Sequence, residues 1–145
     1  MQREDQLKKL QADPYGLAAT AVDEFIRFDA PLHLFERTAT ADVEIGGVMI
    51  KEGQKIASLL GSANRDETMF ENPTEMDITR DPNPQIGFGA GIHFCIGAPL
   101  ARMEMTTSLP MLIEKYPNLN LSSEPVRRPG FVLRGYESVN VNVKN

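Results

Sequence analysis

Cys95 is the only cysteine of the chain, and three glycines surround it just before a predicted helix. Gly89, Gly91 and Gly97 would let the backbone bend sharply and approach a flat, bulky group, because glycine adopts conformations that other residues avoid. The unpaired N–H groups and the dipole at a helix start favour the thiolate form of a cysteine. The segment therefore predicts a thiolate beside a flat ligand, and a buried, inert thiol on a plain turn is the alternative.

Phosphate binding is a second possible role for a glycine-rich loop before a helix. The loop lacks the Lys-Ser/Thr ending of a P-loop. Phe94 also occupies the position at which a dinucleotide-binding loop needs its third glycine. Nucleotide binding is therefore not expected.

The composition describes one soluble globular unit, residues 1–145. The chain has 15 Lys and Arg against 20 Asp and Glu, a net charge of −5, and no run of basic residues, so nucleic acid is not expected as a partner. One cysteine and two histidines exclude an internal disulfide framework and a Cys/His-rich zinc site. No apolar run approaches the ~20 residues that span a bilayer, and the N-terminus lacks the apolar core of a signal peptide. We therefore expect a cytoplasmic protein without membrane contact.

Three helices are predicted around this loop. A short exposed helix covers residues 2–11, and an amphipathic helix begins after Gly16 and stops before Pro31. A third helix runs from Ala98 to about Tyr116, with a kink or early break expected at Pro110. The apolar residues of the second helix recur with helical spacing: Leu17, Ala21, Val22, Phe25 and Ile26.

Short strands and turns make up the rest of the chain. Alternating segments at 43–45, 48–50 and 56–60 predict a small antiparallel sheet, with a hairpin at Gly46-Gly47. Residues 64–86 are rich in X-Pro turns and predict a long meandering connection of the kind that serves a site. Alternation returns at 131–133 and, after a turn at 134–135, at 139–143, where Val139, Val141 and Val143 share one face.

The run from Phe88 to Arg102, F-G-A-G-I-H-F-C-I-G-A-P-L-A-R, resembles the haem-binding signature of bacterial soluble cytochrome P450s. Three further segments match the family in the right order. The resemblance implies a mixed α+β fold: helices, small antiparallel sheets, a long meander, and the ligand loop with its following helix. It also implies haem b as cofactor and Cys95 as the proximal ligand of the iron. Phe88, Gly89 and Gly97 would then lie against the haem.

Glu24 and Arg27 lie on one face of the second helix at i,i+3. Taken alone, they predict an ordinary solvated ion pair. They also resemble the family's structural Glu-Arg pair, which locks this helix to the meander. Glu75 occupies the place where the family has a further cation, so Arg80 is the candidate third partner.

Arg37 and His93 match the family's partners of the haem propionates. Two carboxylates entering an acidic chain require charge-assisted donors, for which arginine is well suited. A solvated strand residue for Arg37 and a satisfied loop histidine for His93 are the alternatives.

Two apolar segments resemble the substrate-facing parts of the family's C-terminal half. Core packing is an equally adequate explanation for both. Their candidate residues are Leu32, His33 and Leu34 in the first segment, and Val132 and Leu133, with Phe131, in the second.

The implied parent protein is a monooxygenase that inserts oxygen from O2 into a small lipophilic substrate, with electrons from a ferredoxin or flavoprotein. The resemblance maps only to the C-terminal part of the fold, without the central helix over the distal haem face or the N-terminal helices. We therefore expect this chain, as a fragment, to be inactive alone, with an exposed apolar face on helix 98–116 that favours self-association. A truncated, non-catalytic remnant that folds or oligomerises without haem is the alternative.

Overall fold

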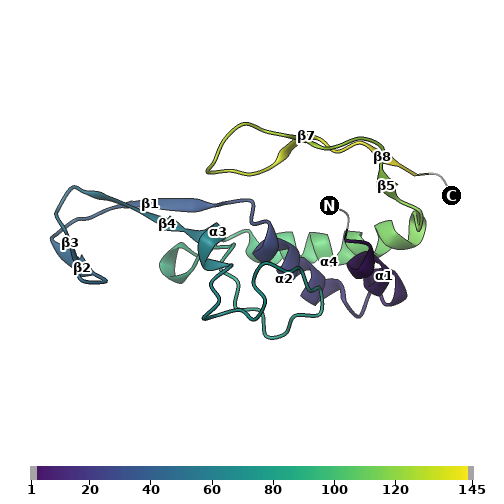
Figure 1. Cartoon of the computed structure of the whole chain (residues 1–145), viewed down its shortest axis with the longest axis horizontal. Coiled ribbons are helices and arrows are strands. Elements are labelled where there is room, and N and C mark those ends of the chain that lie inside the picture. The colour runs from purple at the N-terminus through teal and green to yellow at the C-terminus, as the bar shows by residue number, and fades with distance from the viewer. Residues whose placement is uncertain (1–2, 144–145) are drawn as a thin grey trace.

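The computed structural model describes residues 3–143. Its helices form one layer, and paired strands extend from that layer and lie over it (Figure 1). This is the mixed fold of helices and small antiparallel sheets that the sequence predicts. The helices are α1 (Glu4–Ala12), α2 (Ala18–Phe28), the short α3 (Leu60–Ala63) and α4 (Ala98–Lys115), with a single 3-10 turn, η1 (Gly91–His93).

The core lies where α1, α2 and α4 meet the meander. Leu10, Ala21, Ile78 and Ile113 form a buried apolar cluster. Ala21 and Ile78 are almost fully buried, at 0% and 1% exposure. The predicted α1 is displaced slightly, since it begins at Glu4 and ends at Ala12; Gln2 lies outside the described residues. The buried cluster therefore joins α1, α2 and α4 to the meander.

Helix α4 continues through Pro110 to Lys115, so the expected early break is wrong. A proline inside a helix removes one backbone hydrogen bond and costs about 3 kcal/mol. Here Pro110 is itself buried, and Leu109 and Ile113 on either side of it pack into or against the core cluster. Tertiary packing offsets the local cost, as it does for most helices in proteins.

A long two-stranded ribbon leads away from the helices. Strand β1 (Leu34–Thr38) pairs antiparallel with β4 (Lys55–Leu59), placing Arg37 opposite Ile56. The hairpin of β2 (Val43–Ile45) and β3 (Val48–Ile50) lies at the far end (Figure 1). Gly46 and Gly47 form its turn with φ of 56° and 78°, as predicted.

Two boundaries of this ribbon differ from the sequence expectation. The predicted strand 56–60 begins at Lys55 and ends at Leu59, because Leu60 starts α3. Strand β1 was not among the predicted strand segments, although a solvated strand residue was the alternative considered for Arg37. Residues 64–86 form a succession of turns and bends with no helix or strand, as predicted.

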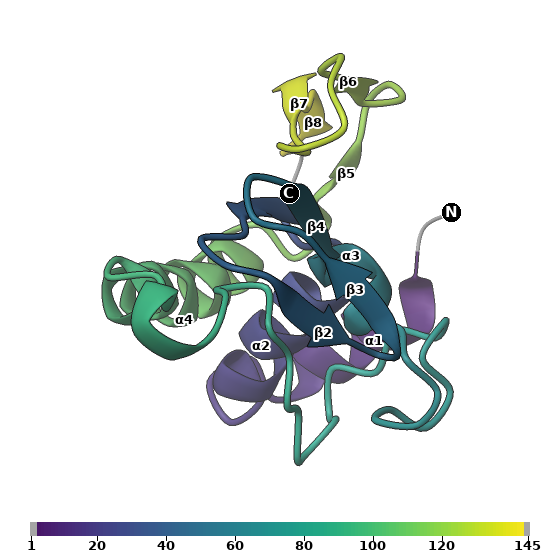
Figure 2. The ribbon, with the colours of Figure 1, turned by 90° about the vertical axis from the view of Figure 1, so that its left-hand side faces the viewer.

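The C-terminal strands form a separate ribbon over the helical layer (Figure 2). Strand β5 (Asn120–Leu121) pairs with β8 (Val141–Asn142), and β6 (Val126–Arg127) pairs with β7 (Tyr136–Ser138). The predicted strand at 131–133 is wrong, because only Leu133 makes a single bridge, to Leu32. The predicted strand 139–143 shrinks to two residues, and its three valines are 43–51% exposed, so no buried face enforces a longer pairing.

Candidate functional site

The cysteine loop folds back on itself ahead of α4. Gly89 and Gly91 have φ of +77° and +63°, the left-handed conformations that glycine accepts without strain. The Cys95 N–H donates to the Phe88 carbonyl at 2.9 Å, and the Ala98 N–H donates to the Cys95 carbonyl at 3.1 Å. These two bonds hold Cys95 between the bend and the first residue of α4.

Gly97 does not make the sharp bend that we expected of it. Its φ is −84°, an ordinary value for any residue. A Cβ atom there would lie 3.7 Å from the Cys95 Sγ, an ordinary van der Waals contact. The bend therefore comes from Gly89 and Gly91, whereas Gly97 lies beside the sulfur and caps α4.

Cys95 is exposed and lines a hollow of about 790 Å³. The buried-thiol alternative is therefore wrong. α2, β1, the cysteine loop and α4 surround the hollow, and its walls are mostly apolar: Ile26, Pro31, Leu32, Phe35, Phe88, Phe94, Ile96 and Met105. Ile96, directly after the cysteine, is 100% exposed, and Phe94 is 48% exposed. Apolar side chains beside an exposed sulfur fit a flat, apolar ligand that is bound through a thiolate, as haem is in P450-type sites.

Phe88 connects the hollow to the helices. Its ring centroid lies 6.4 Å from that of Phe94. The Arg102 guanidinium lies 4.8 Å above the Phe88 ring and donates two hydrogen bonds to Asp23 at 2.9 and 3.0 Å. Since Asp23 is on α2 and Arg102 on α4, both helices hold the phenyl ring in place.

His93 and Arg37 differ in their distance from the hollow. His93 lies in η1 and lines the hollow. Arg37 is exposed on β1, where it donates to the Glu36 carbonyl at 2.8 Å and its guanidinium stacks 5.2 Å from the Phe35 ring. Phe35 lines the hollow and Arg37 does not. The Phe35 ring therefore lies between the Arg37 guanidinium and the hollow.

Glu24 and Arg27 form a fully buried pair, with 0% of either side chain exposed. The solvated ion-pair alternative is therefore wrong. Arg27 donates through Nε and Nη2 to the two Glu24 carboxylate oxygens at 2.8 Å each. It also donates to the backbone carbonyls of Asn64, Pro73 and Glu75 at 2.8–2.9 Å. The Arg27 guanidinium thus joins α2 to the meander at Asn64, where the meander begins, and again at Pro73 and Glu75.

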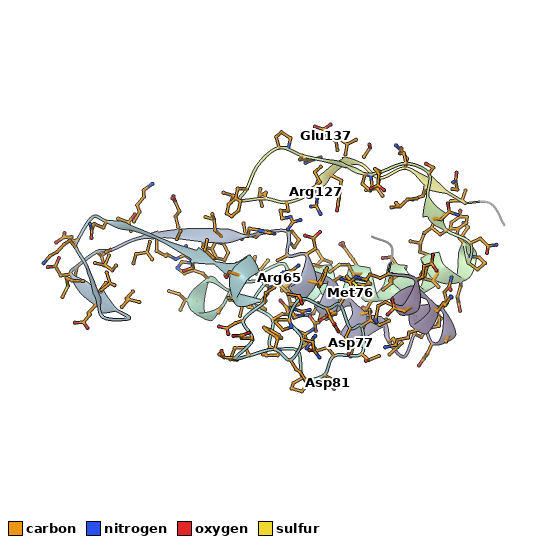
Figure 3. All side chains as sticks on the ribbon, viewed as in Figure 1. Arg65, Met76, Asp77, Asp81, Arg127 and Glu137 are labelled. Atoms are coloured by element: carbon orange, nitrogen blue, oxygen red, sulfur yellow. The ribbon has the colours of Figure 1, made fainter. Side chains whose placement is uncertain are left out.

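Arg80 is the third charged member of this cluster, and its Nε lies 3.2 Å from Glu24 Oε2. Glu75, which occupies the place of the expected cation, contributes its backbone carbonyl instead. The Asp77 N–H and the Asn83 amide also donate to Glu24, at 2.8 and 3.1 Å. Figure 3 shows Asp77 and Asp81 on the meander next to the helical layer. The buried carboxylate therefore has several donors, as a charge away from water requires.

Two residues that sequence reasoning missed position the cysteine loop. Asn64 is fully buried, and its Oδ1 accepts the Ile86 N–H at 2.8 Å, three residues before Gly89. Gly87 passes so close to α2 that a Cβ would lie 2.5 Å from Ile26 Cγ2 and 3.1 Å from the Ile26 carbonyl. Neither residue has a local sequence signal, because both roles depend on segments distant along the chain.

The two substrate-facing candidate segments lie side by side. The His33 N–H donates to the Val132 carbonyl at 2.9 Å, and Leu32 bridges Leu133. Leu32 lines the hollow of Cys95, whereas His33 lines a smaller hollow at the C-terminal ribbon. Leu34 pairs with Leu59 in the β1–β4 ribbon, and Val132 and Leu133 are 46% and 67% exposed. The structure therefore brings the two segments together but places only Leu32 on the wall beside the thiol.

We expect His33 to make the stability of the chain depend on pH. Burial, followed by the nearby Arg134 guanidinium, lowers the pKa of His33 from its ordinary value of 6.5. The unfolded chain then binds a proton more readily than the folded chain, so stability is lost as the pH falls through that value. Urea unfolding at about pH 7.5 and about pH 5.5 should show lower stability at the acidic pH. His33→Gln should flatten this slope, and since His93 is present in both proteins, an unchanged slope would exclude His33 as the cause.

The comparisons with known proteins identify the family. The model of the family described as "Cytochrome P450" matches residues 2–133. The chain belongs to the cytochrome P450 family. The biotin biosynthesis cytochrome P450 of Bacillus subtilis (strain 168) is 42% identical over 142 residues, covering 97% of this chain and 36% of that protein. The steroid C26-monooxygenase of Rhodococcus jostii (strain RHA1) is 43% identical over 126 residues, covering 86% of this chain and 27% of that protein.

Solved cytochrome P450 structures share the same arrangement. P450BioI in complex with acyl carrier protein carrying hexadec-9Z-enoic acid matches with a TM-score of 0.94 at 42% identity, covering 98% of this chain and 37% of that one. CYP109E1 from Bacillus megaterium in complex with testosterone matches with a TM-score of 0.94 at 31% identity, and the match covers 99% of this chain and 40% of that one. The chain therefore spans about a third of the length of the curated relatives it matches.

Two further observations concern residues 3–143. No helix in this range is long and apolar enough to cross a membrane. Nor does this range contain a cluster of three or more His, Cys, Asp or Glu side chains placed to hold a metal ion.

Proposed function

We propose that this chain forms the haem-thiolate side of a cytochrome P450 monooxygenase, with Cys95 as the proximal ligand of the haem iron. The observation that carries the proposal is the exposed Cys95, placed before α4 in an apolar hollow of about 790 Å³. The family membership implies haem b as the cofactor. A thiolate ligand donates electron density to the iron and favours O–O cleavage, and this is the chemistry that bound haem supplies.

The other residues of the site bind and orient the cofactor. Phe88, Gly89 and Gly97 lie around the cysteine and would contact the macrocycle. His93, in the hollow, and Arg37, beside Phe35, would donate charge-assisted hydrogen bonds to the propionates. The buried Glu24–Arg27 pair is a positioning element, because it fixes the meander that leads into the cysteine loop.

For the whole protein we infer insertion of one oxygen atom of O2 into a lipophilic organic substrate, with electrons from a ferredoxin or flavoprotein. The related proteins include a monooxygenase acting on a steroid and enzymes of biotin and polyketide biosynthesis. Leu32 is the substrate-facing candidate on the wall of the hollow. His33, Leu34, Val132 and Leu133 remain candidates that lie farther from the thiol.

The ligand assignment is tested by spectroscopy of the haem-reconstituted chain. The reduced, carbon-monoxide-treated protein should show the red-shifted Soret band of thiolate-ligated haem, and Cys95→Ser should abolish it. Met103→Leu is the control, because Met103 is 59% exposed on α4, the helix that follows Cys95, and does not line the hollow. A band that persists in Cys95→Ser would exclude Cys95 as the ligand. A flat visible spectrum of the unaltered chain would support the remnant that folds without haem.

We also predict that the reconstituted chain alone does not hydroxylate substrates. Its hollow is open to solvent, so water is not excluded from a reaction there. The assay supplies O2, a ferredoxin with its reductase and a lipophilic substrate such as lauric acid, and hydroxylated product would contradict the prediction.

We also expect the chain to self-associate. Four large apolar side chains of helix α4 are 43–59% exposed: Leu100, Met103, Met111 and Leu112. Exposed apolar surface of this kind favours association, which sedimentation measures.

A further inference from the structure

Asp23 on α2 accepts three hydrogen bonds beside the cysteine loop. Its Oδ1 accepts from Arg102 Nε and Nη2 at 3.0 and 2.9 Å, and from Gln85 Nε2 at 3.1 Å. Arg102 is on α4, and Gln85 lies near the end of the meander. One carboxylate therefore joins two helices to the segment that leads into the loop. We call Asp23, Gln85 and Arg102 the Asp23 cluster.

Gln85 connects this cluster to the backbone before Phe88. Its Oε1 accepts the Gly87 N–H at 2.7 Å, while its Nε2 donates to Asp23. Both bonds require the same orientation of the side-chain amide, because the nitrogen only donates and the oxygen only accepts. Gly87 directly precedes Phe88. The Asp23 cluster therefore fixes the backbone at the base of the Phe88 side chain.

Arg102 holds the Phe88 ring itself. The guanidinium carbon lies 4.8 Å from the ring centroid. Since two N–H groups of the same guanidinium bind Asp23, the planar group has a fixed position over the ring. The Phe88 carbonyl also accepts the Cys95 N–H at 2.9 Å. The residue that Arg102 holds is therefore hydrogen-bonded to the residue that carries the thiol.

The Asp23 cluster can affect a ligand of Cys95 only through Phe88. Phe88 lines the hollow of Cys95, whereas Asp23, Gln85 and Arg102 do not. The Arg102 and Asp23 side chains are 38% and 32% exposed, so solvent screens the ion pair and its own contribution to stability is small. The pair therefore matters more for the position of the Phe88 ring than for the free energy of unfolding.

We propose that Arg102, anchored by Asp23, is a positioning residue of the haem-thiolate site, which holds the Phe88 ring in the apolar wall beside Cys95 and so limits the access of water to the sulfur. This inference rests on the proposed function, in which Cys95 ligates the haem iron. Reduction adds negative charge to a haem-thiolate unit, and water at the sulfur stabilises that charge. An intact apolar wall therefore keeps the reduction potential low.

The test uses the double variant Asp23→Asn/Arg102→Gln, which removes the cation and its anchor together and leaves the net charge of the chain at −5. The control is Asp42→Asn/Lys51→Gln, which makes the same kind of change at an exposed ion pair, with 2.7 Å between Lys51 Nζ and Asp42 Oδ2. Neither control residue lines the hollow of Cys95. Circular dichroism checks that both variants fold.

The first measurement is NMR of the Phe88 ring in the haem-free chain. Loss of a cation–π contact at a partly exposed site should raise the population of displaced ring positions by about two- to fivefold. The Phe88 signals should therefore shift in the Asp23→Asn/Arg102→Gln variant and stay unchanged in the control.

The second measurement is the reduction potential of the haem-reconstituted chain. The Asp23→Asn/Arg102→Gln variant should have a potential higher by about 20–40 mV, which corresponds to about a two- to fivefold change in the equilibrium constant of a one-electron reduction. The control should keep the potential of the unaltered chain. A merely structural ion pair would not change the potential, because the net charge is the same before and after the substitution.

Three results would overturn the proposal. Unchanged Phe88 signals in the folded double variant would show that Arg102 does not hold the ring. An unchanged potential together with shifted Phe88 signals would make the pair a structural contact only. An equal rise in the control would show an effect of ion pairs in general. The thiolate Soret band separates this inference from the proposed function: its absence from the unaltered chain contradicts the role of Cys95, whereas an unchanged potential with a normal band contradicts the role of Arg102.

Discussion

Replacing Arg27 by methionine is expected to destabilise the chain by about 3–5 kcal/mol, because it removes the cation from a fully buried carboxylate. Methionine fills much of the same volume but donates no hydrogen bond. Glu24 would keep only Arg80, the Asn83 amide and the Asp77 N–H as donors. The backbone carbonyls of Asn64, Pro73 and Glu75 would also lose the hydrogen bonds that Arg27 donates to them. Urea unfolding followed by circular dichroism measures the change in unfolding free energy.

Arg102→Met is the matched control for this measurement. Arg102 also pairs with a helix α2 carboxylate, Asp23, but the two side chains are 38% and 32% exposed. Solvent screens this pair, so its loss together with the stacking on Phe88 should cost about 1 kcal/mol. If Arg27→Met and Arg102→Met lowered the free energy of unfolding by similar amounts, burial of the Glu24–Arg27 pair would not be the reason for its contribution to stability.

Gly89→Ala is expected to destabilise the chain by about 2–3 kcal/mol and to reduce haem binding with it. A non-glycine residue in the left-handed region costs about 1–2 kcal/mol, and Gly89 has φ of +77°. The new Cβ would also lie 3.2 Å from Phe35 Cε2 and 3.4 Å from the His93 carbonyl. Phe35 and His93 both line the hollow of Cys95, so the strain would fall on the site itself.

Gly53→Ala is the control that separates the cost of the left-handed backbone conformation from the cost of the new Cβ contacts. Gly53 has a similar φ of +81°, but a Cβ there would meet nothing within 4 Å. This variant should therefore lose about 1–2 kcal/mol and bind haem as the unaltered chain does. If both variants lose the same stability and Gly89→Ala retains haem normally, the contact with Phe35 has no role in the site.

Much of the fold was predictable because its signals are local. The helical spacing from Leu17 to Ile26 predicted α2, and Gly46-Gly47 predicted the β2–β3 hairpin. The X-Pro pairs of residues 64–86 predicted a connection without regular structure. An early break at Pro110 and a strand at 131–133 were predicted but do not form, because the packing of α4 offsets the cost of the proline and because Phe131, Val132 and Leu133 are 46–67% exposed.

By itself, the sequence determined the family, the cysteine loop and the candidate ligand, because Phe88 to Arg102 is a continuous motif whose residues act close to one another. Only the tertiary structure decided which donors surround Glu24, with Arg80 reaching it across 56 positions. The same holds for Asn64 and Gly87, which position the loop, and for His33, whose side chain contacts Arg134 near the C-terminal ribbon. Each of these contacts joins segments that are distant along the chain, and no spacing within one segment encodes which distant groups the folded backbone brings together.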